Sequence, residues 1–65
     1  MNTKSFDILL SDLSDMSERI GRVLMEGGAK DYAEYKSLCG EIRGLSQAHM
    51  YITDLVRKME QDDDE

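Results

Sequence analysis

The chain has 65 residues, 40% of them hydrophobic, with one cysteine, no proline and a formal net charge of −6. A chain of this length forms one domain at most and buries only about 60% of the surface that its unfolded form exposes, so its stability is marginal unless something is added. The single cysteine excludes an internal disulfide, and the excess of acids argues against a protein that binds nucleic acid through its phosphates. Association with another chain is the expected source of a larger core.

The first predicted helix spans about residues 4–26. Thr3 or Ser5 can accept a hydrogen bond from the amides that open it, and Asp7 lies in the first turn, where the helix dipole favours an anion. Its apolar side chains recur every three or four positions, which is typical of one buried helix face: Phe6, Leu9, Leu13, Met16, Ile20 and Val23. Gly27 and Gly28 follow, and glycine readily adopts the left-handed conformation that ends a helix.

The second predicted helix spans about residues 31–60. Asp31 and Glu34 have the spacing of a capping box, with Asp31 as the cap and Glu34 reaching back. Its apolar run consists of Tyr35, Leu38, Ile42, Leu45, His49 and Ile52. Four acids end the chain, and their mutual repulsion predicts a disordered acidic tail over residues 61–65. The predicted domain organisation is therefore one hairpin over residues 1–60, followed by this tail.

The two apolar runs face each other if the chain folds back at the glycine pair. The pairs are then Val23 with Tyr35, Ile20 with Leu38, Met16 with Ile42, Leu13 with Leu45, Leu9 with His49 and Phe6 with Ile52. The residue numbers of every pair add to the same total. This pattern predicts an all-α fold, an antiparallel two-helix hairpin of coiled-coil type. Two copies could form a four-helix bundle, or the hairpin could dock on a larger protein.

A partner interface is expected beside this seam. With Phe6 and Tyr35 as the first heptad positions, one flank is uncharged and consists of Leu10, Ser17, Leu24, Tyr32, Cys39, Ser46 and Thr53. Solvated seams usually carry Glu and Lys at such positions, so this flank indicates a second contact. The second helix is also longer than the first. Leu55, Val56 and Met59 should therefore lack cover within the hairpin and extend the partner interface.

Gly40 and Gly44 are four residues apart in the second predicted helix. Two glycines inside a helix destabilise it by about 2 kcal/mol together, so another interaction should compensate. One interpretation is a strip that another backbone approaches closely, as in pairs of membrane helices. The other interpretation is a bent and partly flexible helix.

The sequence shows no constellation of residues that could perform catalysis or hold a metal ion. Cys39 and His49 lie about 15 Å apart along one helix, so they cannot share a zinc ion. We therefore expect a protein that is not an enzyme and uses no cofactor, metal or small-molecule substrate. No apolar stretch is long enough for a membrane span, and the first residues lack the apolar core of a signal peptide, so we expect a cytoplasmic location.

The segment from Gly28 to Leu45 reads GAKDYAEYKSLCGEIRGL and follows a short amphipathic helix. In this layout the chain resembles small helical-hairpin accessory proteins of podovirus-type tailed bacteriophages, chiefly in the glycine hinge, Asp31-Tyr32 and the stretch from Gly40 to Leu45. The resemblance implies a structural or accessory role in head or portal assembly, in the host cytoplasm or the virion. The partner would be a second copy or a larger phage protein. The alternative function is an acidic phage-encoded inhibitor of a host nucleic-acid enzyme or defence complex.

Overall fold

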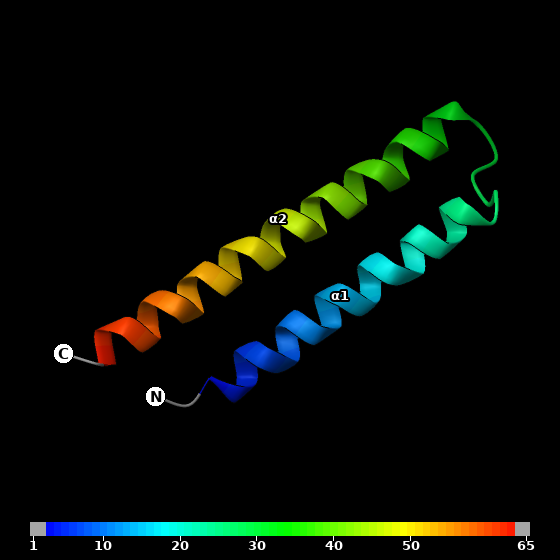
Figure 1. Cartoon of the computed structure of the whole chain (residues 1–65). Coiled ribbons are helices and arrows are strands. Elements are labelled where there is room, and N and C mark those ends of the chain that lie inside the picture. The colour runs from blue at the N-terminus through cyan, green and yellow to red at the C-terminus, as the bar shows by residue number, and fades with distance from the viewer. Residues whose placement is uncertain (1–2, 64–65) are drawn as a thin grey trace.

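Two long helices packed side by side make up the computed structural model, which describes residues 3–63 (Figure 1). Helix α1 spans Lys4–Met25 and helix α2 spans Tyr32–Asp63. They run in opposite directions, joined at one end by a short hinge, and residues 3–63 contain no strand. The predicted all-α antiparallel two-helix hairpin is confirmed.

The ends of α1 lie within one residue of the predicted ends, but α2 is longer than predicted. The helix continues through Asp63, so the prediction of a disordered tail is wrong for residues 61–63. No glycine or proline follows Gly44, and the backbone therefore contains nothing that would end the helix earlier. The last two residues of the predicted tail lie outside the described residues.

The glycine pair ends α1 in a Schellman motif, as its position after the helix predicted. Gly27 has φ +73, in the left-handed region. The amide of Gly28 donates to the carbonyl of Val23 at 2.8 Å, and the amide of Gly27 donates to the carbonyl of Leu24 at 3.1 Å. A Cβ on Gly28 would lie 2.6 Å from Cγ1 of Val23. Gly27 is therefore needed for its conformation and Gly28 for the close approach of its backbone to the helix.

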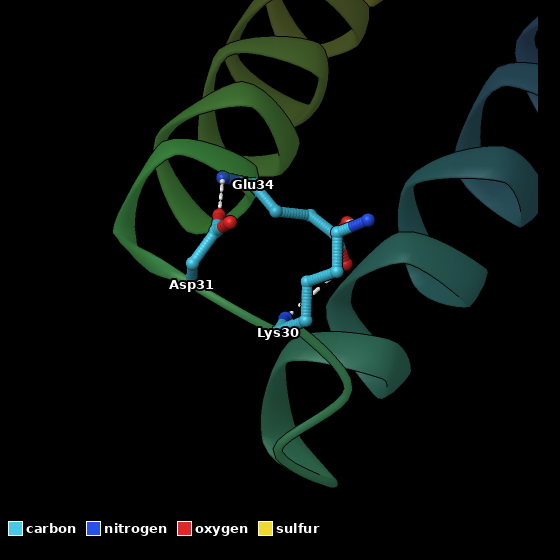
Figure 2. A network of polar contacts seen from close by, with 3 residues as sticks. All are labelled: Lys30, Asp31 and Glu34. Atoms are coloured by element: carbon cyan, nitrogen blue, oxygen red, sulfur yellow. Dashed lines mark hydrogen bonds and ion pairs between the residues drawn. The ribbon is translucent and has the colours of Figure 1, made fainter.

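Asp31 caps the start of α2, and Glu34 closes the capping box from the other side (Figure 2). The Oδ1 atom of Asp31 accepts a hydrogen bond from the amide of Glu34 at 2.8 Å. Glu34 reaches back one residue further than predicted, because its Oε1 accepts from the amide of Lys30 at 3.3 Å. Its Oε2 lies 3.9 Å from Nζ of Lys30. The hinge is thus fixed by backbone hydrogen bonds at both ends.

The seam between the helices is made of half-buried side chains, since no described residue is fully buried. One half-buried stripe on α1 consists of Phe6, Leu10, Leu13, Ser17, Ile20 and Leu24. The facing stripe on α2 consists of Leu38, Ile42, Leu45, His49, Ile52 and Val56. Taken in order from the hinge, we infer the pairs Leu24 with Leu38, Ile20 with Ile42, Ser17 with Leu45, Leu13 with His49, Leu10 with Ile52 and Phe6 with Val56.

This register corrects the predicted pairing by about one helical turn. Tyr35, predicted opposite Val23, is 47% exposed, because the first turn of α2 extends past the end of α1 in this register. A surface groove agrees with the shift. It is lined by Met16 and Ile20 of α1 and by Glu41, Gly44 and Leu45 of α2, whereas the predicted pairing placed Ile20 beside Leu38.

Replacing Gly27 with alanine should lower the free energy of unfolding by about 1 kcal/mol, because a left-handed φ is strained for a residue with a Cβ. Gly40→Ala is the matched control. No described atom lies within 4 Å of a Cβ built at Gly40, so its replacement should raise the free energy of unfolding by up to about 1 kcal/mol through helix propensity. Urea unfolding followed by circular dichroism, at one protein concentration, measures both changes. Equal effects of the two substitutions would contradict the role of Gly27 in the hinge.

Two pairs of engineered cysteines test the register, each in a Cys39→Ser background. Leu10→Cys with Ile52→Cys places two thiols opposite each other in the inferred register and should form a disulfide within one chain. Leu9→Cys with His49→Cys is the matched pair for the register predicted from the sequence, and it should oxidise much more slowly. Thiol titration and mass spectrometry of the monomer fraction follow both reactions. Faster closure of the second pair would show that the inferred register is wrong.

Candidate interaction surface

One side of the seam carries an uncovered apolar strip that both helices supply. Leu9, Met16 and Val23 of α1 are 43%, 41% and 40% exposed. On α2, Gly44 shares a groove with Met16, and the residues at helical spacing from it lie on the same side. We call this surface the apolar face, and it consists of Leu9, Met16, Val23, Gly44, Ala48, Tyr51 and Leu55.

The other side of the seam carries a second groove, which mixes polar and apolar side chains. It is lined by Ser17, Ser46, His49, Met50, Thr53, Asp54 and Arg57. The Oγ1 atom of Thr53 donates to the carbonyl of His49 at 2.8 Å, and Nη2 of Arg57 donates to Oδ1 of Asp54 at 2.9 Å. The side chains of Thr53 and Arg57 therefore have hydrogen-bond partners within their own helix.

An aromatic pair lies at the hinge end of α2. The rings of Tyr32 and Tyr35 stack with their centroids 6.2 Å apart and their planes inclined by 28°. The pKa of the Tyr35 phenol is raised, first by its hydrogen bond with the Cys39 side chain and then by Coulombic interaction with the same thiol. Cys39 is a half-buried free cysteine. The tyrosine pair lies in the part of α2 that extends beyond α1, apart from the apolar face.

Several residues predicted at a partner interface are half-buried beside the hairpin's own seam. Leu10, Ser17 and Leu24 are more covered than their neighbours Leu9, Met16 and Val23, and Ser17 lines one groove with Ser46 and Thr53 of the same predicted flank. Contact of this flank with a partner stays a prediction. Val56 and Met59 are half-buried, which corrects the prediction that they lack cover within the hairpin, because the shifted register moves α1 toward the carboxyl end of α2.

The other predicted interface residues remain accessible in part. Tyr32 and Ser46 are exposed, Cys39 is half-buried, and Leu55 is 39% exposed on the apolar face. Gly40 and Gly44 are exposed, and a Cβ on either would meet no described atom within 4 Å. The two helices of the hairpin therefore do not use this strip for close approach to each other.

The sequence contains a signal for the exposed apolar face that the heptad reading missed. Leu9 and Leu10 are adjacent, as are Val23 and Leu24, so the apolar stripe of α1 is wider than one seam requires. A helix turns 100° per residue, and two neighbours therefore cannot both point into the same narrow seam. One member of each pair packs against α2 and the other stays at the surface.

Within residues 3–63, no three histidine, cysteine or carboxylate side chains gather where they could hold a metal ion. Neither described helix combines the length and hydrophobicity that crossing a bilayer requires. Comparison with known proteins found no match to a family model, a curated protein or a solved structure.

Proposed function

We propose that this chain is a noncatalytic protein-protein interaction module, a structural accessory protein that acts in phage head or portal assembly. The observation that carries the interaction role is the apolar face, where four large side chains stay about two-fifths exposed. Burying a side chain of this kind stabilises a complex by roughly 1.5 to 3 kcal/mol relative to full exposure, so partial burial of several can hold two proteins together. The place in phage assembly rests on the resemblance in layout.

The distribution of charge favours this role over the alternative, an acidic inhibitor that imitates nucleic acid. Acids and bases are mixed on the described surface, as in the groove lined by Asp15, Glu18, Arg19 and Arg22. Lys30 and Arg57 form ion pairs with Glu34 and Asp54. A phosphate mimic needs a continuous array of negative charge, whereas a mixed surface suits a protein partner.

Photo-crosslinking in the cells that produce the protein tests the proposed function. A benzophenone amino acid in place of Val23, on the apolar face, should form adducts with the protein that covers this face while particles assemble, either a second copy of the chain or a head or portal protein. The matched control replaces Ile8, which is also exposed but lies on the side of α1 away from the seam. Mass spectrometry identifies the adducts.

The outcomes of this experiment separate the two functions. Adducts of the Val23 position with assembly proteins, absent for the Ile8 position, support the proposal. Adducts with a nuclease, a polymerase or a defence protein would instead support the inhibitor. Equal labelling from both positions would contradict a specific role for the apolar face.

A further inference from the structure

The hairpin exposes more surface than a compact monomer of its mass. Its accessible surface is 5175 Å² for 7.4 kDa, and the scaling for folded monomers gives about 4,200 Å² at that mass. Its radius of gyration is 15.4 Å, against about 11 Å for a compact domain of this length. The excess of roughly 1,000 Å² is close to the 800 Å² or so that each partner buries in a standard interface.

We propose that a second copy of this chain covers the apolar face, packed antiparallel about a two-fold axis that passes beside Met16. This inference rests on the proposed function, because it specifies which protein occupies the apolar face. A two-fold contact requires that one surface complement itself after rotation. The side chains of α1 meet that requirement along the whole face. On α2 the small residues at the centre meet it, while Tyr51 and Leu55 lie at the levels of Glu41 and Ser37 of the other copy.

On α1 the complementary pattern is centred on Met16. Leu9 and Val23 lie seven residues before and after it, so an antiparallel copy places Leu9 against Val23 and Met16 against Met16. Asp12 and Arg19 flank this line on the side away from the seam, four residues before and three after Met16. The same rotation brings the acid of each copy to the base of the other.

On α2 the pattern is centred midway between Gly44 and Ala48. These two small residues face each other after the rotation, and neither carries a side chain that would hold the backbones apart. Further out, Glu34 of one copy lies at the level of Lys58 of the other. In the inferred register the midpoint of Gly44 and Ala48 lies at the same level as Met16. One axis therefore serves both helices.

A parallel arrangement of the two copies is the alternative two-fold packing of the same face. It would place α1 of one copy over α2 of the other at equal levels along the rod. Met16 would then lie over Gly44 and Ala48 of the other copy, and Asp12 would lie away from Arg19. The charge and cysteine variants below distinguish the two arrangements, because only the antiparallel one brings Asp12 to Arg19 and Met16 to Met16.

Exchanging the charges of Asp12 and Arg19 tests the proposal. Dimerisation of the purified full chain is measured by sedimentation equilibrium at low ionic strength, because exposed charges are least screened there. The wild type should sediment at twice its 7.4 kDa. Asp12→Arg or Arg19→Asp alone turns two attractive contacts per dimer into repulsive ones and should weaken dimerisation about tenfold or more. The double variant D12R/R19D restores opposite charges across the axis and should return the dissociation constant to within about threefold of wild type.

Asp54→Arg, Arg57→Asp and their combination are the matched controls, since both residues line the groove on the other side of the seam. Circular dichroism verifies that each variant is helical. A wild-type chain that stays monomeric overturns the proposal, and so does a dimer in which the double variant dissociates as readily as the single ones.

A single cysteine at Met16 tests the position of the axis. In a Cys39→Ser background, Met16→Cys should form a disulfide between copies, whereas Ile8→Cys should not. A dimer that lacks the crosslink at position 16 overturns the antiparallel geometry.

These measurements use the purified chain alone, so they can fail separately from the proposed function. A monomer that still crosslinks to assembly proteins through Val23 would contradict the proposed dimer and support the proposed function. A dimer whose Val23 position forms adducts only with its own second copy in cells would support the dimer and would contradict contact between the apolar face and assembly proteins.

Discussion

The whole fold depends on one contact, the seam along which α1 packs against α2. A two-helix hairpin has a single interface between elements, and each helix can bury only one stripe of side chains in it. The rest of each helix faces water or another molecule. Which stripe enters the seam therefore decides every other property of the surface, from the exposure of Met16 to the half-burial of Val56. A rotation of α1 about its own axis by the angle between two neighbouring residues would exchange the roles of whole rows of side chains.

The sequence predicted the local features of the hairpin because each depends on a few neighbouring residues. The Schellman motif at Gly27 and the cap at Asp31 follow from conformational preference and short-range hydrogen bonds. The register could not be predicted in the same way, because it depends on the path of the hinge over residues 26–31 through space. The prediction counted Tyr35 as the first seam residue, although the hinge carries the first turn of α2 past the end of α1.

The heptad rule also named the less covered neighbour three times in α1. The heptad rule prefers the first residue of each neighbouring pair, because that residue is apolar and stands at the fourth heptad position. The pairs are Leu9 and Leu10, Met16 and Ser17, and Val23 and Leu24. Between Met16 and Ser17 the rule favours Met16 for a second reason, because a serine hydroxyl contributes less to an apolar seam than a methionine side chain does. In the structure Ser17 lines the groove on the other side of the seam, together with Ser46 and His49. The thioether of Met16 is left for the surface, where a flexible apolar side chain suits an interface.

The polar groups in the seam link the register to association. Ser17 and His49 give up apolar contact that leucines would supply, so the isolated hairpin relies less on its own core and more on whatever covers the apolar face. The register also controls whether that face complements itself, because Met16 and the midpoint of Gly44 and Ala48 lie at one level only in the inferred pairing. With the pairing predicted from the sequence, the two centres would lie about one turn apart along the rod, and no single two-fold axis could serve both helices. Packing within the chain and the proposed packing between two copies therefore favour the same register, and each contact would make the other more specific.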